Sequence, residues 1–447
     1  MPGDQAAARA GRESALSIRV EADEHVGPEG GAVDQAVHEA EAQPLTREQA
    51  RTQVREAALH DSAIGAVGLE LEFHLYDAVA PDRPLDWSDV QTVLAGLPEL
   101  PGGSAVSVEP GGQVELSTPA MPGVVAAAAA LAADQRVLSA TARECGYAVL
   151  SIGADPLRTP ARVNPAPRYV AMERYFETTG WAGTGRAMMN ATAAVQLNLN
   201  AGPAAGWPAR LAHLHRLGLV LLAVSACSPV LGGTASGWRS MRQQCWLGMD
   251  PARGGPLAAG GDPAGAWVDY ALAAPVMLVR EPAGSGMRPA PPGVGMGVWI
   301  DRPALLGRPP TREDLAYHLT TLFPPVRPRG YLELRFLDAV PARWWPGLVA
   351  VAATLADDAA AAELAAAACA SGEPVDLTAA ARDGIADPRL RALAGRLLRI
   401  AVEHCPPGLR PDAEAYADLV AGGHTPGDEI RAGRSPLAML EDGLGDT

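Results

Sequence analysis

The stretch Val67-Gly68-Leu69-Glu70-Leu71-Glu72-Phe73-His74-Leu75 alternates strictly between an apolar residue and a polar or very small one. A period of two is typical of a β-strand that buries one face and turns a polar face the other way. The same pattern recurs in a hairpin over residues 106–117, which turns at 110–112, and in residues 195–200 and 331–336. The sequence therefore predicts a sheet with one apolar face and one polar face.

Alanine-rich segments with helical character are placed so that they can cover the apolar face of that sheet. These predicted helices span residues 46–60, 122–144, 208–227, 346–371, 388–404 and 411–421. Gly- and Pro-rich loops are predicted at residues 153–168, 229–238, 250–265 and 281–294. There is no βαβ rhythm with a G-x-G-x-x-G turn, which argues against a doubly wound dinucleotide fold, and a layered α+β domain is predicted.

The 447 residues, 48% of them hydrophobic, suffice for one large domain or two to three smaller ones. We expect a partly disordered leader over residues 1–44, a single catalytic domain over 45–430 and a tail over 431–447. Gly, Pro and acidic residues without periodicity characterise the leader. Thr46 followed by Gln49 predicts a capping box where the domain begins.

Charge and cysteine content restrict the partners and the compartment. The net charge of −15 argues against nucleic acid and against an anionic membrane surface. Five scattered cysteines without a C-x-x-C motif fit a reducing compartment better than a disulfide framework. No secretory signal pattern opens the chain, and the most apolar run, residues 217–227, is about half the length needed to cross a bilayer. A soluble, cytoplasmic protein is expected.

The chain contains no lysine, so every basic side chain is an arginine. This excludes a Walker A lysine, a Schiff-base lysine for pyridoxal phosphate and a kinase-type phosphate lysine. Any phosphate chemistry must use arginine, a metal ion or backbone amides. Arg327 and Arg329 run into the strand that carries Arg335, and three arginines within nine residues suit a polyphosphate. For Arg242 two roles are equally plausible: it could bind a substrate carboxylate with two donors, or it could form a structural ion pair.

The polar faces of the four strand regions are unusually rich in carboxylates. For one strand alone, a solvated face is the simpler interpretation, but the set combines five glutamates with amides and one arginine. Carboxylates this close repel one another, and a hard cation such as Mg²⁺ or Mn²⁺ relieves the repulsion. Glu70 and Glu72, two apart on a strand and so about 7 Å from each other, can hold different ions. The polar set comprises Glu70, Glu72, His74, Glu109, Gln113, Glu115, Ser117, Gln196, Asn198, Asn200, Glu333 and Arg335.

These same residues resemble the glutamate–cysteine ligase family, in the branch shared by plant-type enzymes and bacterial relatives. The pattern is most similar to that of the bacterial ergothioneine-pathway enzymes, and its motifs span about residues 65–360. They are Gly68-Leu-Glu-Leu-Glu72, Glu109-Pro-Gly-Gly-Gln-Val-Glu-Leu-Ser117, Met188-Met189, Val195-Gln-Leu-Asn-Leu-Asn200, Ser240 to Trp246, Val268 to Met277, His318 to Pro324 and Leu332-Glu-Leu-Arg335.

The resemblance implies a glutamine-synthetase-like core, in which a curved antiparallel sheet forms a funnel flanked by helices. It also assigns roles to residues of this chain. Glu72 and Arg335 are expected to be catalytic, with Arg335 meeting the transferred γ-phosphate, and Gln196 is expected to be a weak or indirect metal ligand. The expected metal ligands are Glu70, Glu72, Glu109, Glu115 and Glu333; the ATP-binding residues are Arg327, Arg329 and Arg335; the substrate-binding residues are Arg242, Gln113 and Asn198.

The activity implied is ATP- and Mg²⁺-dependent ligation of the L-glutamate γ-carboxylate to the amine of L-cysteine. The reaction would pass through γ-glutamyl phosphate and yield γ-glutamylcysteine, ADP and phosphate, for ergothioneine biosynthesis. The partners are then small molecules only, and the oligomeric state is not predicted. One departure concerns Ala191, where plant-type members carry an arginine, so a different amine acceptor stays open. A guanidino kinase and a non-catalytic regulator of the same fold are the remoter alternatives.

Overall fold

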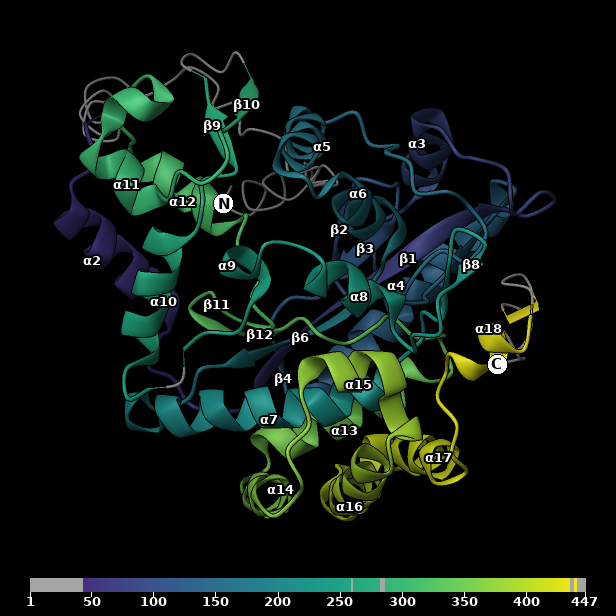
Figure 1. The fold of residues 1–447 in the computed structure, drawn as a ribbon. Coiled ribbons are helices and arrows are strands. Elements are labelled where there is room, and N and C mark those ends of the chain that lie inside the picture. Colours follow the sequence, from purple (N-terminus) through teal and green to yellow (C-terminus); the bar gives the residue numbers. More distant parts are fainter. Residues whose placement is uncertain (1–42, 259, 282–285, 435–437, 440–447) are drawn as a thin grey trace, which may run out of the picture.

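The computed structural model describes residues 43–258, 260–281, 286–434 and 438–439 (Figure 1). The predicted leader, except for its last two residues, lies outside these described residues, and so does most of the predicted tail. The limits proposed for the catalytic domain therefore stay a prediction.

An antiparallel sheet of eight strands forms the centre of the molecule. Its spatial order is β11-β12-β6-β1-β3-β2, and β4 and β5 pair with the two ends of β1. All four predicted strand regions are present and are neighbours in this sheet, so the sequence interpretation of them was correct. The strands are β1 (Ala66–Asp77), β2 (Ala105–Val108), β3 (Val114–Ser117), β4 (Met121–Pro122), β5 (Tyr147–Leu150), β6 (Val195–Asn200), β11 (Val326–Pro328) and β12 (Tyr331–Leu334).

Helices cover the apolar face of the sheet. Leu69, Leu71 and Phe73 of β1 point to this face and are completely buried. Such burial stabilises the fold by about 1.5–3 kcal/mol per side chain. Helices α4 (Val124–Glu144), α7 (Trp207–Ser225) and α13 (Trp345–Asp357) pack against the strands, and α14 (Ala359–Ala370), α16 (Pro388–His404) and α17 (Arg410–Ala421) form a further layer (Figure 1).

The helix predicted over residues 346–371 is in fact two helices, α13 and α14. The break falls at Asp358, which adopts an extended backbone conformation. Its side chain accepts a hydrogen bond from the backbone N–H of Ala361 and so caps the start of α14. An aspartate that satisfies a helix terminus competes with continuation of the preceding helix, which propensity alone does not reveal.

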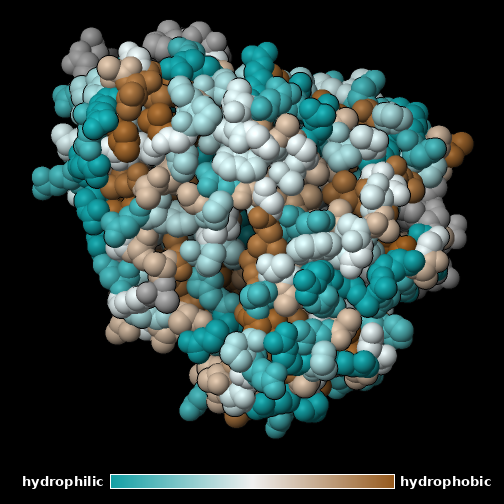
Figure 2. Space-filling view, in the orientation of Figure 1, coloured by the Kyte–Doolittle hydropathy of each residue, from teal (hydrophilic) through white to brown (hydrophobic). Residues whose placement is uncertain are grey.

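Helix α4 is long and apolar enough, by length and composition alone, to cross a membrane. In this structure it is a core helix of the domain, because it packs against β1, β3, β4, β5 and α13. In Figure 2, apolar residues on the face turned toward the viewer form small groups separated by hydrophilic ones.

The polar face of the sheet is roofed by α5 (Pro167–Thr179), α6 (Ala182–Ala191) and α8 (Met241–Leu247), which contact one another in series. The capping box predicted at Thr46 and Gln49 is confirmed at the start of α2. Helix α2 packs against α10 at one side of the molecule (Figure 1). The remaining elements are α2 (Arg47–Ala58), α3 (Trp87–Gly96), α9 (Pro251–Gly254), α10 (Pro263–Ala273), α11 (Met296–Asp301), α12 (Arg312–Leu319), α15 (Leu377–Asp383), α18 (Asp428–Arg431), β7 (Val230–Leu231), β8 (Thr234–Ala235), β9 (Leu278–Arg280) and β10 (Met287–Pro289).

Candidate active site

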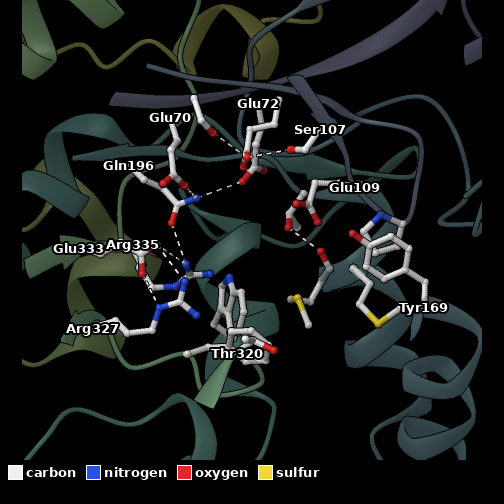
Figure 3. Close-up of a pocket in the computed structure, with 18 of the residues that line it drawn as sticks. Glu70, Glu72, Ser107, Glu109, Tyr169, Gln196, Thr320, Arg327, Glu333 and Arg335 are labelled. Atoms are coloured by element: carbon white, nitrogen blue, oxygen red, sulfur yellow. Dashed lines mark hydrogen bonds and ion pairs between the residues drawn. The ribbon is translucent and has the colours of Figure 1, made fainter. Parts of the chain in front are cut away.

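A cavity of about 350 Å³ lies between the polar face of the sheet and its helical roof (Figure 3). All five predicted metal-binding glutamates line it, together with Gln196 and the four arginines predicted for ATP and substrate. The sheet supplies the floor, and α5, α6, α8 and the turn after α12 supply the roof. Volume and composition fit a site for a polar ligand of ordinary metabolite size.

Strand register explains why residues far apart in sequence meet on this floor. Glu70 on β1 pairs with Ser117 on one side and with Gln196 on the other. Glu72 pairs with Glu115. Because side chains of paired residues point to the same face, polar alternation in each strand builds continuous polar rows across the sheet.

At one end of the cavity the carboxylates of Glu72 and Glu115 face each other across the strands. The Glu72 carboxylate accepts a hydrogen bond of 2.9 Å from the backbone N–H of Ala194. Glu115 Oε1 accepts hydrogen bonds of 2.9 Å from the hydroxyls of Ser107 and Ser117. Burial, and then repulsion from neighbouring carboxylates, raises the pKa of both Glu72 and Glu115 to about 8. This end therefore has an unmet need for positive charge.

The opposite end of the cavity is rich in arginine. Glu333 is completely buried, and its pKa is nevertheless lowered to about 2, because the attraction of three arginines outweighs the effect of burial. Arg327 grips its carboxylate with two donors, one at 2.9 Å. Arg335 and Arg329 lie 3.3 and 3.5 Å from the same carboxylate. Three positive groups around one negative group leave this end net positive and suited to phosphate.

Gln196 connects the two ends. Its Nε2 donates to the Glu70 carboxylate at 2.9 Å, and its Oε1 accepts from Arg335 Nη1 at 2.8 Å. The guanidinium of Arg335 also lies 6.0 and 5.6 Å from the ring centroids of Trp246 and Phe323. The amide thus fixes the position of Arg335 relative to the acidic strand, which is a different arrangement from direct metal ligation.

Arg242 on α8 combines the two roles that its sequence context left open. Its Nη1 lies 3.9 Å from Asp338, a fully buried carboxylate that also accepts hydrogen bonds from Ser228 and Ser240. Its Nη2 donates to the backbone carbonyl of Arg335 at 2.8 Å. Among the described residues, Nη1 has no hydrogen-bond partner although it is buried. A buried donor without an acceptor lowers the stability of the fold, and a bound ligand that accepts a hydrogen bond from it would remove this penalty.

Four residues that the alternating pattern singled out, His74, Gln113, Asn198 and Asn200, do not line the cavity. Gln113 is buried and donates to the backbone carbonyl of Thr192 at 2.8 Å, which ties the hairpin to the roof. Asn198 lies beside Glu70 and donates to it at 2.8 Å. His74 is buried in the part of β1 that pairs with β5. The structure therefore gives Gln113 and Asn198 supporting contacts and does not bring either one to the cavity wall.

Some residues that line the cavity were not predicted from the sequence. Five of them come from α5 and α6, in a part of the chain where no helix was predicted. Met188, Met189, Trp246, Thr320 and Phe323 lay within motifs quoted for the family resemblance, but no role was assigned to them. The wall residues that were not predicted are Ala105, Ser107, Pro110, Arg168, Tyr169, Met172, Met188, Met189, Thr192, Trp246, Thr320, Phe323 and Tyr331.

The carboxylate end fits a hard divalent cation in its donor chemistry. Buried oxygen donors whose pKa values are raised by mutual repulsion are stabilised in their charged form by such an ion. Within the described residues, no three carboxylate, imidazole or thiol groups already converge on one point as a preformed metal site. Glu72, Glu109 and Glu115 would hold the ion. Both Glu333 oxygens contact arginines, and its role as a metal ligand stays a prediction.

The melting temperature of the protein should depend on the ionisation of this carboxylate cluster and on Mg²⁺ bound to it. The pKa of these carboxyls is about 8 in the folded protein and 4.5 ordinarily, so between these pH values the folded state holds a proton that the unfolded state has lost. The free energy of unfolding of the metal-free protein should therefore fall as the pH rises from 5 to 8. Added Mg²⁺ should raise the melting temperature by several degrees at pH 8 and by much less at pH 5.5, because protons compete with the ion. Melting curves with and without Mg²⁺ across this range test it; an equal Mg²⁺ effect at both pH values contradicts the interpretation.

Comparison with known proteins places the chain in a family. The model described as glutamate-cysteine ligase family 2 matches residues 66–436. The chain is 47% identical over 382 residues to the glutamate–cysteine ligase EgtA of Mycobacterium tuberculosis, covering 84% of this chain and 88% of that protein. It is 46% identical over 388 residues to the protein of that name from Mycolicibacterium smegmatis, covering 86% and 90%.

More distant similarity supports the same placement. The chloroplastic glutamate–cysteine ligase of Arabidopsis thaliana is 30% identical over 305 residues, which cover 60% of this chain and 56% of that one. The crystal structure of a glutamate–cysteine ligase from Francisella tularensis in complex with AMP shares the fold, with a TM-score of 0.50 and 15% identity. It covers 86% of this chain and 89% of that one, and it confirms the predicted fold class. The chain belongs to the glutamate-cysteine ligase family 2.

Proposed function

We propose that this protein is an ATP-dependent glutamate–cysteine ligase. It joins the γ-carboxylate of L-glutamate to the amine of L-cysteine and releases ADP and phosphate. Beyond family membership, one observation carries the proposal: the cavity has a carboxylate end and an arginine end, with Gln196 donating to Glu70 at 2.9 Å and accepting from Arg335 at 2.8 Å. A cavity with one acidic end and one basic end suits ATP bound together with a metal ion, next to the substrate carboxylate that ATP phosphorylates.

In the first step, an oxygen of the glutamate γ-carboxylate attacks the γ-phosphorus of ATP. The bond to the β–γ bridging oxygen breaks, ADP leaves, and an acyl phosphate is formed. Arg335 is positioned to stabilise the charge on the transferred phosphoryl oxygens, and it is held in place by Gln196 and Glu333. Arg327 is committed to Glu333 on both its oxygens, so its main contribution is to hold that carboxylate in place.

Arg242 is the group best placed to receive the glutamate carboxylate that does not react. Its guanidinium is almost completely buried and lines the cavity between Glu72 and Arg335. Mg²⁺, which Glu72, Glu109 and Glu115 would hold, would neutralise phosphate charge and orient the two anions for reaction. Mn²⁺ meets the same donor preference.

In the second step, the neutral amine of the acceptor attacks the carbonyl carbon of the acyl phosphate. The C–N bond forms, inorganic phosphate leaves, and the amine gives up its proton to a carboxylate of the cavity. The helices that cover the sheet would limit the access of water, which would otherwise hydrolyse the acyl phosphate. We further propose a cytoplasmic location, small molecules as the only partners, and a role of the product in ergothioneine biosynthesis.

ADP release in the presence of Mg²⁺ and ATP is the direct test. We expect release to require glutamate and to rise strongly on adding cysteine, with alanine, serine and glycine as poorer acceptors. Mass spectrometry should identify γ-glutamylcysteine as the product. Release that depends on glutamate but is indifferent to cysteine would leave a carboxylate–amine ligase with another acceptor. Release without glutamate would remove the proposal altogether.

A further inference from the structure

A fifth arginine, Arg168, lines the described cavity wall and was not predicted from the sequence. It lies in the first turn of α5 and donates to the hydroxyl and the backbone carbonyl of Thr320, at 2.9 and 3.2 Å. Its guanidinium carbon lies 4.9 Å from the centroid of the Tyr317 ring. These contacts from α12 and the turn after it fix the plane of the guanidinium, which is the condition for a selective fork on a planar anion.

The start of α5 is tied directly to the hairpin loop that carries Glu109. Asn164, just before the helix, donates to the backbone carbonyl of Val108 at 2.9 Å, and the Tyr169 hydroxyl reaches the same carbonyl at 3.4 Å. Figure 3 shows Glu109 and Tyr169 on the side of the cavity opposite Arg327 and Glu333. The start of α5, and Arg168 with it, is therefore fixed relative to the floor of the cavity.

Sulfur-containing side chains form the roof above this corner. Of the eleven buried members of the roof's apolar cluster, six are methionine or cysteine, and five of the chain's 11 methionines belong to it. Met172, Met188 and Met189 also line the cavity. Thioether side chains are polarisable and conform to varied apolar shapes, whereas they offer nothing to a charged side chain. The roof thus suits a small, uncharged and soft group such as a thiol.

We propose that this corner is the subsite for the amine acceptor, in which Arg168 binds the α-carboxylate and the methionine roof contacts the thiol-bearing side chain. The inference rests on the proposed ligase function and adds the basis of acceptor selection. It requires an acceptor with a free α-carboxylate and a small neutral side chain. Ala191, the position that departs from plant-type sequences, is buried and does not line the cavity; in this chain Arg168 provides the positive charge instead.

Arg168 is the best candidate for the acceptor because the other two substrates are served elsewhere. Phosphate would be met by Arg329 and Arg335, which lie beside Glu333 at the ends of β12. The buried Arg242 donor lies on α8, close to Glu72 and Arg335. Arg168 belongs to a different wall, formed by α5 and the turn after α12.

Cysteine and cysteamine provide the test, since they share the amine and the thiol and differ in the carboxylate. For the wild type, we expect kcat/KM to favour cysteine by about 100-fold. In Arg168→Gln, kcat/KM for cysteine should fall about 10- to 100-fold, mainly through KM, while the value for cysteamine stays the same and the preference collapses. KM for glutamate and for ATP should not change.

Arg186→Gln is the matched control. Arg186 lies on the neighbouring helix α6, is 48% exposed, and pairs loosely with Glu173 at 3.5 Å and Glu177 at 3.7 Å without lining the cavity. It should keep the wild-type preference. If Arg168→Gln melts at a much lower temperature, Arg168→Lys replaces it: the charge is retained and the fork is lost, so only KM for cysteine should rise.

Two outcomes overturn the inference while leaving the ligase in place. One is an unchanged preference for cysteine over cysteamine in the folded variants. The other is a rise in KM for glutamate rather than for cysteine, which would assign Arg168 to the donor substrate. Failure of the proposed function is distinct, because the wild type would then show no ADP release that depends on glutamate and an acceptor.

Discussion

Replacement of Arg335 by glutamine is expected to lower kcat by about 10³-fold or more, with little effect on KM for cysteine. The guanidinium is held by Gln196 at 2.8 Å and by Glu333 at 3.3 Å, and it lies over Trp246 and Phe323. Such a fixed donor contributes most where charge develops during phosphoryl transfer, and water cannot replace it once the cavity is filled. Single-turnover formation of ADP isolates this step from product release.

Arg335→Lys separates charge from geometry. It keeps a cation but loses the planar fork, so we expect a rate between those of the wild type and Arg335→Gln. Arg280→Gln is the control: this arginine pairs with Glu313 on the surface at 2.8 Å, and its loss should leave kcat unchanged. A folded Arg335→Gln variant with kcat within about 10-fold of wild type would remove Arg335 from the chemical step.

The sheet and the floor of the site could be predicted from the sequence because alternation with a period of two is a local signal. Glu70, Glu72 and Glu115 each stand two residues from another polar position, and strand pairing brings them to one face. Register, however, is not visible in the sequence. The pairing of Glu72 with Glu115, rather than with a residue two places along, depends on the hairpin turn and on packing of the apolar face.

The roof could not be predicted, and neither could the partners of buried polar groups. No sequence pattern singled out α5 or α6, and their positions depend on tertiary contacts with the hairpin and with α8. Arg168 therefore had no signal of its own. Alternation also shows which face a side chain occupies but not what covers it. Alternation placed Asn198 on the polar face, but the sequence does not show that its side chain lies against Glu70.

Glu333 illustrates the same limit for charge. From the sequence it is one of five equivalent carboxylates, but in the structure its environment is opposite to that of Glu72. Arginines hold the pKa of Glu333 at about 2, while burial and Glu115 raise that of Glu72 to about 8. The difference arises because β11 places Arg327 opposite Glu333 in the sheet. Only the three-dimensional pairing separates a carboxylate that organises arginines from one that needs a cation.

Glu72→Gln should therefore change activity and metal-free stability in opposite directions. The amide keeps an oxygen that can accept the N–H of Ala194 and removes a negative charge that faces Glu115. Because the ionised form of Glu72 is disfavoured in the fold, its removal should raise the metal-free melting temperature at pH 8 by several degrees. Turnover should fall by about 10³-fold or more, and the stabilisation by Mg²⁺ should largely disappear.

The matched control for this experiment is Glu363→Gln on α14, an exposed glutamate outside the cavity, which should change neither property. Glu115→Gln should repeat the behaviour of Glu72→Gln, since burial and neighbouring carboxylates raise the pKa of both residues and the two would share one ion. Loss of activity alone has many causes, including damage to the fold. Loss of activity together with a gain in metal-free stability has few causes. It requires a negative charge that is unfavourable when the site holds no metal ion and necessary when the ion is bound. A variant that is both less stable without metal and less active would instead make Glu72 a structural residue.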